Sequence, residues 1–160
     1  MKKILFITTR YPFPVLGGDK IRAVEIIKFL SKKNKVDLIC LTDKNHKKIT
    51  HSKICNNTKI FKINLIKRLI YVILSFIKIE PLQVGFYHSH EMMKHINKIQ
   101  SNYQTIIFHT LRTCQYLPKN FKGKKILEMT DLISLRYLQM VEQLSIFNPA
   151  IPFSIAVKSV

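Results

Sequence analysis

The sequence is poor in glycine, acidic residues and tryptophan. Its 160 residues include four glycines, nine Asp and Glu residues together, and no tryptophan. The chain contains neither a G-x-G-x-x-G fingerprint nor a Walker A loop, so these two phosphate-binding motifs are excluded. Two of the four glycines, Gly17 and Gly18, are nevertheless adjacent. Adjacent glycines suit a turn whose backbone angles other residues avoid.

Cysteine patterns, metal-ligand patterns and long apolar runs are scarce as well. The three cysteines show no C-x-x-C spacing, which favours reduced thiols in a cytoplasmic protein. His88 and His90 could share a metal ion on a strand but not on a helix, and their surroundings are helical in pattern, so no metal site is predicted. The longest uninterrupted apolar run spans Leu69 to Leu74, whereas a membrane span needs roughly 20 such residues. The N-terminus leads directly into a strand-length segment, unlike a signal peptide.

Basic residues are abundant: 27 Lys and Arg residues give a formal net charge of +18. Such a charge attracts nucleic acid, anionic lipid or a phosphorylated substrate. The lysines are spread along the whole chain, so a composition bias of the source organism would produce the same count. No sequence pattern of a common nucleic-acid-binding module is present, and nucleic acid is therefore not the expected partner.

The hydrophobic pattern predicts one α/β domain. Hydrophobic residues make up 47% of the chain, enough for a packed core. Strand-like and helix-like segments alternate, which predicts a Rossmann-like, mostly parallel sheet with helices on both faces. The predicted strands are Ile4–Thr8, Val36–Leu41, Ile60–Leu65, Thr105–His109 and Lys125–Met129, and the predicted helices are Lys20–Lys33, Ile66–Ile79, His88–Gln100 and Leu132–Leu144. Asp19 is the expected N-cap of the first helix.

In such sheets ligands bind beyond the carboxyl ends of the strands. Gly17 and Gly18 lie between the first strand and the first helix, where backbone N–H groups could hold a phosphate or a sugar hydroxyl; a plain turn is the alternative. Arg10 and Arg22 flank this pair and could reach an anion held there. A solvated helix arginine is an equal alternative for Arg22.

Three further candidates follow the fourth and fifth predicted strands. His109 could form a hydrogen bond to a substrate, or it could be solvated or bonded to backbone. Arg112 could pair with phosphate through its planar fork, or it could form a surface salt bridge. Asp131 could face a ligand and also cap the following helix.

The segment 66–79, IKRLIYVILSFIKI, has two interpretations. One is a helix buried in the core. The other is an interfacial helix that rests on lipid, with Lys67, Arg68 and Lys78 at the level of the headgroups. The second interpretation predicts peripheral contact with the inner face of the cell membrane.

Several of these segments, in order, resemble one protein family. The opening contains Arg10-x-Pro12-x-Pro14, followed by Gly-Asp-Lys-Ile-Arg and a helix with Ile-Ile-Lys-Phe-Leu. Ile107-Phe108-His109 with Arg112, and the segment EMTDLISLR at 128–136, continue the similarity. The chain thus resembles the N-terminal part of family 4 glycosyltransferases, which have the GT-B fold, and in particular the sugar transferases of bacterial polysaccharide and exopolysaccharide synthesis.

This resemblance implies an enzyme of two Rossmann-like domains with the active site between them. The N-terminal domain receives a glycan or lipid-linked acceptor. Gly17 and Gly18 would contact the donor diphosphate or the transferred sugar, and His109 would lie near the reacting sugar as a catalytic residue. The second domain holds the nucleotide-sugar, transfer retains the anomeric configuration, and neither a metal nor another cofactor is needed.

The length of the chain adds an expectation about its domains. We expect residues 1–160 to be the acceptor-side GT-B domain, incomplete at its C-terminus, with the nucleotide-sugar domain absent and possibly carried by another chain. Such a fragment should be inactive or nearly so. The alternative function is a non-enzymatic, basic α/β module that binds an anionic lipid, glycan or nucleic acid.

Overall fold

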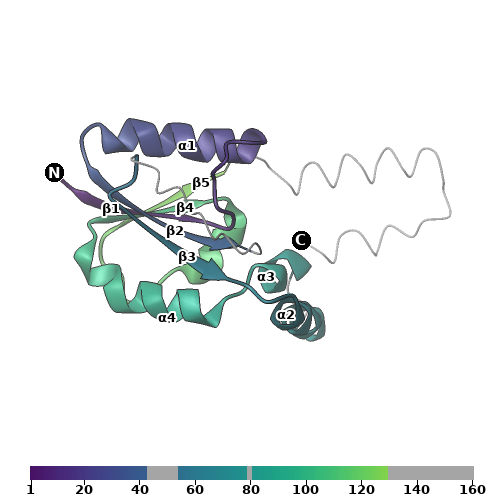
Figure 1. Ribbon diagram of the computed structural model, residues 1–160. Coiled ribbons are helices and arrows are strands. Elements are labelled where there is room, and N and C mark those ends of the chain that lie inside the picture. Colours follow the sequence, from purple (N-terminus) through teal and green to yellow (C-terminus); the bar gives the residue numbers. More distant parts are fainter. Residues whose placement is uncertain (43–53, 79–80, 130–160) are drawn as a thin grey trace, which may run out of the picture.

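The structure, a computed structural model, describes residues 1–42, 54–78 and 81–129 and has an α/β fold (Figure 1). Five parallel strands form one sheet in the order β3-β2-β1-β4-β5. The strands are β1 Lys3–Thr8, β2 Lys35–Thr42, β3 Asn57–Lys62, β4 Thr105–His109 and β5 Lys124–Glu128. The α-helices are α1 Gly18–Ser31, α2 Leu65–Ile77, α3 Leu82–Phe86 and α4 His90–Ile99. Two short 3-10 helices are η1 Gln100–Asn102 and η2 Leu111–Tyr116. The predicted fold class, a Rossmann-like parallel sheet with helices on both faces, is confirmed.

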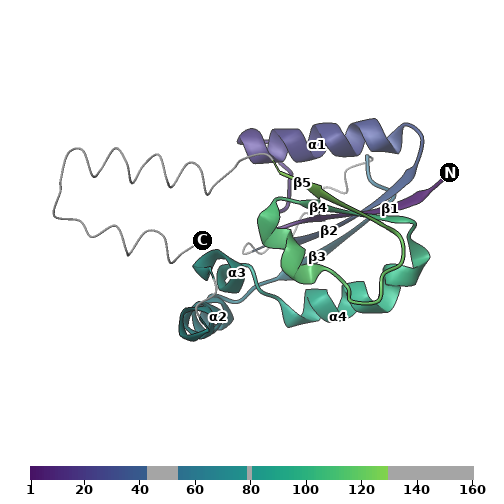
Figure 2. The same cartoon turned by 180° about the vertical axis from the view of Figure 1, so that it is seen from behind.

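The core consists of two layers, one on each face of the sheet. Along β1, Ile4 and Phe6 pack with the buried face of α1, whereas Leu5 and Ile7 belong to the cluster on the α4 side. Successive side chains of a strand point to opposite faces, so a strand covered on both faces is apolar throughout. Figures 1 and 2 show α1 on one face of the sheet and α4 on the other.

Helix α1 begins at Gly18, two residues before the predicted start at Lys20. Gly17 is the N-cap, and Asp19 lies in the first helical turn, so the assignment of Asp19 as N-cap is wrong. The helix starts here because the carbonyl of Gly17 already accepts the N–H of Ile21 at 3.1 Å. Val24 and Ile27 are buried as expected, but Phe29 is 72% exposed because it lies on the opposite side of the helix from Ile27.

Strand β3 begins and ends three residues before the predicted segment Ile60–Leu65. The cause is Asn64, whose side chain accepts the N–H of Ile66 at 3.1 Å and so caps α2. A residue that caps a helix has left the strand, and the apolar residues from Leu65 onward therefore become helical.

Helices α2 and α3 pack against each other beyond the carboxyl end of the sheet (Figures 1 and 2). Helix α3 was not predicted. A Cβ at Gly85 would lie 2.4 Å from both Ser75 Oγ and the carbonyl oxygen of Tyr71, so glycine permits the close contact of the two helices.

The sequence left open whether 66–79 is a core helix or an interfacial one, and the described part is not a core helix. Ser75 is the buried residue of α2, while the apolar side chains that cover the rest of its surface are 41–73% exposed. They are Leu65, Ile66, Leu69, Ile70, Ile73, Leu74, Phe76 and Ile77. Among the described residues, no helix is long and apolar enough to span a membrane.

The boundaries of β4 agree with the prediction, and those of β1, β2 and β5 agree within one residue. Helix α4, with η1 after it, occupies most of the segment predicted as His88–Gln100. The predicted helix Leu132–Leu144 and the candidate Asp131 lie outside the described residues.

Candidate functional site

The carboxyl ends of β1, β4 and β5 meet at one edge of the sheet, as parallel strands require. Thr8 pairs with His109, and His109 pairs with Glu128 in the strand register. The loop to α1 follows β1, and η2 follows β4. The described candidates that follow β1 and β4 therefore lie at the same edge of the sheet, as the sequence analysis expected.

The two adjacent glycines have different conformations. Gly17 has φ 94° and ψ 151°, a backbone conformation that is essentially confined to glycine. Gly18 is the first helical residue, and a Cβ there would have no atom within 4 Å. No side chain caps the start of α1, so its first N–H groups lack a side-chain acceptor at a helix end that favours negative charge. An exposed turn of this kind can receive an anionic group.

His109 lies beside this turn and is buried. Its side chain is 3% exposed, and Nε2 is 3.1 Å from the backbone carbonyl oxygen of Asp19 in the first turn of α1. A carbonyl oxygen can only accept, so Nε2 carries a proton in this contact. His109 therefore links the end of β4 to the start of α1.

Glu128 is a site residue that the sequence analysis missed. Its Oε2 lies 2.6 Å from His109 Nδ1, although their orientation is not that of a hydrogen bond, and its Oε1 accepts the Nε–H of Arg22 at 2.5 Å. The signal that could have found it is the position of an acidic residue at the end of a strand, level with a histidine at the end of the neighbouring strand. Arg22 is thus bound to a carboxylate instead of pointing freely at the glycine turn.

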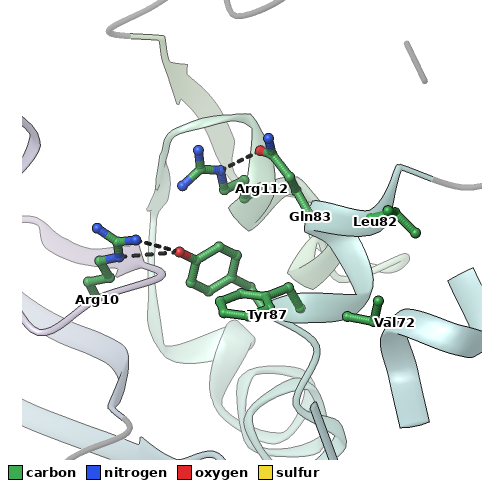
Figure 3. Close-up of a pocket in the computed structure, with 7 residues that line it drawn as sticks. Arg10, Val72, Leu82, Gln83, Tyr87 and Arg112 are labelled. Carbon is green, nitrogen blue, oxygen red and sulfur yellow. Dashed lines mark hydrogen bonds between the residues drawn. The ribbon is translucent and has the colours of Figure 1, made fainter. Parts of the chain in front are cut away.

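A second group of candidates lies on the side of α3. Arg10 donates from Nε and Nη2 to the hydroxyl oxygen of Tyr87 at 3.2 and 2.8 Å, and Arg112 donates from Nε to Gln83 Oε1 at 2.8 Å (Figure 3). The guanidinium carbons of Arg10 and Arg112 are 5.9 and 5.4 Å from the centre of the same Tyr87 ring. The structure therefore brings together two arginines that the sequence analysis had proposed separately.

These arginines line an open pocket of about 300 Å³. Gln83 and Tyr87 complete its polar side, and the apolar side is formed by Val72, Leu82 and Phe86. Gly17 and His109 are not among the lining residues, so the glycine turn and the arginine pocket are two distinct places at the carboxyl end of the sheet.

Segment η2 holds α3 in place beside the pocket. The Tyr116 hydroxyl donates to the backbone carbonyl of Tyr87, and Gln115 Nε2 donates to the carbonyls of Val84 and Arg112 at 3.1 and 3.0 Å. The Tyr87 side chain belongs to the buried core cluster. The hydrogen bonds from η2 and the burial of Tyr87 therefore fix the position of the residues that line the pocket.

The cysteines form no site of their own in the part of the chain that the structure describes. Cys40 is buried, and burial raises the pKa of its thiol; burial also raises the pKa of Cys55, to about 11. Such thiols are poor nucleophiles near neutral pH. Within residues 1–42, 54–78 and 81–129, no three His, Cys, Asp or Glu side chains gather where they could hold a metal ion.

No protein-family model matches the chain, and no curated protein matches it either.

Proposed function

We propose that this chain is the acceptor-side domain of a retaining glycosyltransferase with the GT-B fold. The observation that supports it best is the contact between His109 Nε2 and the carbonyl of Asp19, because it joins the histidine at the end of β4 to the glycine turn at the start of α1. By the family resemblance, the histidine lies near the reacting sugar, and the glycine turn contacts the diphosphate that leaves.

In this proposal the turn at Gly17 and Gly18 stabilises negative charge. As the bond between the sugar and the diphosphate breaks, charge develops on the leaving phosphate oxygen. The N–H groups at the start of α1 are fixed in advance, and fixed donors stabilise such charge without reorganisation. The positive φ of Gly17 permits the turn that exposes these groups.

His109 is proposed to act near the transferred sugar. Its Nε2 proton is now donated to the Asp19 carbonyl, and the ring is buried. A sugar hydroxyl that takes the place of this carbonyl would accept the same proton. Glu128, held by Arg22, lies against the other side of the ring and fixes its position beside the turn.

We further propose that the acceptor is a glycan or lipid-linked glycan at the inner face of the cell membrane, and that α2 contacts the lipid. The apolar residues of α2 are exposed, and so are Lys67, whose Nζ is 3.5 Å from Glu91 Oε1, and Lys78 at the end of the helix. An apolar face flanked by cations is the pattern of a helix that rests on an anionic membrane. The donor in this proposal is a nucleotide-sugar bound by a second domain.

The test is a transfer assay on membranes from cells that express the coding region together with any reading frame that follows it. A panel of nucleotide-sugars is supplied, and the product is examined by NMR for its anomeric configuration. Transfer with retention is expected. H109Q should lower the transfer rate by roughly tenfold or more, because the loss of one hydrogen bond to a reacting group raises the barrier by about 1.4 kcal/mol. F29Q, which changes an exposed residue on α1, is the matched control and should transfer normally. Absence of transfer from every donor, or inversion, would refute the proposal.

The net charge of +18 together with the exposed face of α2 favours a second candidate, a non-enzymatic module that binds an anionic partner. Binding of the purified chain to liposomes and to nucleic acid across a salt series tests it. Steep loss of nucleic-acid binding with salt, without any lipid binding, would favour this candidate over the enzyme.

A further inference from the structure

The pocket beside Tyr87 is lined by two cationic side chains, Arg10 and Arg112. Among residues 1–42, 54–78 and 81–129, neither Arg10 nor Arg112 forms an ion pair with a carboxylate; their partners are the neutral Tyr87 hydroxyl and Gln83 amide. Each guanidinium keeps further N–H groups beyond these bonds, and a guanidinium fork fits the oxygens of a phosphate group. The polar side of the pocket is therefore suited to an oxyanion.

The opposite side of the same pocket is apolar and continues onto an exposed surface. Val72 comes from α2 and Leu82 from α3 (Figure 3). Phe86 of α3 completes this side. Leu82 and Phe86 are 49% and 38% exposed, and Phe76, one helical turn after Val72 on α2, is 73% exposed. A ligand that fills the pocket thus meets cations on one side and hydrocarbon on the other.

The two helices that carry this apolar side are fixed to each other and to the pocket. Arg68 of α2 stacks on the ring of Phe86, with its guanidinium carbon 4.3 Å from the ring centre. The rings of Tyr71 and His88 have centres 4.4 Å apart, and His88 Nδ1 is 3.0 Å from Gln115 Oε1 of η2. The apolar surface therefore has a defined position relative to the two arginines.

We propose that this pocket binds the phosphate headgroup of an anionic lipid, with the phosphate between Arg10 and Arg112 and the hydrocarbon chains on the exposed face of α2 and α3. Charge complementarity selects this occupant, because the choline cation of a zwitterionic lipid offsets the charge of its phosphate, whereas an anionic lipid offers the two guanidinium groups an uncompensated one. A polynucleotide would satisfy the arginines but would leave the apolar side exposed. The inference goes beyond the proposed function, since lipid binding requires no sugar transfer.

The main test measures binding of the purified chain to phosphatidylcholine vesicles with and without phosphatidic acid. We expect binding that depends on phosphatidic acid and that falls about 30-fold in R10Q/R112Q, because each basic side chain at an anionic surface contributes about fivefold. K94Q/K98Q is the matched control: it removes the same charge from exposed positions of α4 and should bind within about threefold of the wild type. Equal losses in both double variants, or unchanged binding in R10Q/R112Q, would overturn the proposal.

A second pair of variants tests the apolar side. Phe76 on α2 and Phe29 on α1 are exposed to almost the same extent, 73% and 72%. We expect F76Q to weaken vesicle binding about tenfold or more, as removal of a lipid-facing aromatic side chain should, and F29Q to leave it unchanged. Equal effects of the two substitutions would contradict a lipid-facing α2.

A labelling experiment on the wild-type chain keeps the proposal testable if a variant fails to fold. Phenylglyoxal modifies accessible arginines, and mass spectrometry locates the modified residues. Dodecyl phosphate should protect Arg10 and Arg112, whereas inorganic phosphate at the same concentration should not. Equal protection by inorganic phosphate would assign the pocket to a free anion, and protection by an oligonucleotide alone would assign it to nucleic acid; either result would refute a lipid site.

Discussion

The two adjacent glycines should respond in opposite ways to the same substitution. Gly17 has φ 94°, a region that side-chain-bearing residues rarely adopt. Holding alanine there costs about 1–3 kcal/mol of folding free energy. Gly18 is helical, with open space where a Cβ would lie. Alanine at Gly18 reduces the entropy of the unfolded chain and should stabilise the fold by about 0.4–1 kcal/mol.

Thermal unfolding measures this difference directly. For a chain of this size, 1 kcal/mol corresponds to roughly 2–4 °C in Tm. Gly17→Ala should therefore lower Tm by about 2–12 °C, while Gly18→Ala should leave it unchanged or raise it by about 1–4 °C. Amide exchange adds a local measurement, because the N–H of Ile21 is bonded to the carbonyl of Gly17. Exchange at Ile21 should accelerate in Gly17→Ala alone.

The comparison is internally controlled, since both variants add one methyl group at neighbouring exposed positions. Composition, charge and hydrophobicity change equally in the two proteins. Equal changes in Tm, or a larger loss in Gly18→Ala, would mean that Gly17 does not hold the positive-φ conformation. The turn beside His109 would then differ from the one described, and the phosphate-binding role proposed for it would lose its basis.

Three further predictions concern other parts of the fold. Gly85→Ala would place a Cβ 2.4 Å from Ser75 Oγ and should destabilise the protein by about 1–3 kcal/mol in urea unfolding; no loss would refute the close α2–α3 contact. Tyr103→Phe removes a 2.8 Å bond to Asp37 Oδ2 and should cost about 1–2 kcal/mol; an unchanged urea midpoint would contradict it. Burial raises the pKa of Cys55 to about 11. Because the thiolate is the nucleophile, the rate of Cys55 labelling by iodoacetamide in the folded protein should rise about tenfold per pH unit between pH 8 and 10. A plateau near pH 9 would indicate an ordinary thiol.

Local pattern was sufficient to predict most of the sheet. A strand buried on both faces is a short apolar run, and a helix with one buried side repeats its apolar residues every three or four positions. Both signals lie within a few neighbouring residues, so β4 was predicted with its observed bounds. Because parallel strands share one carboxyl end, the proximity of His109 to the glycine turn could be predicted too.

The arrangement of the charged groups was decided by tertiary structure. Arg10 and Tyr87 are 77 residues apart in the chain, and Arg22 and Glu128 are 106 apart. No local periodicity encodes such pairs, because their geometry depends on how the loops and α3 pack after the sheet has formed. A five-residue helix like α3 has little intrinsic stability, so it depends on its contacts with α2 and η2. Sequence alone therefore predicted that His109 and the glycine turn lie at this edge, whereas the fold added Glu128 and Tyr87 and determined which charged groups are paired and which line a pocket.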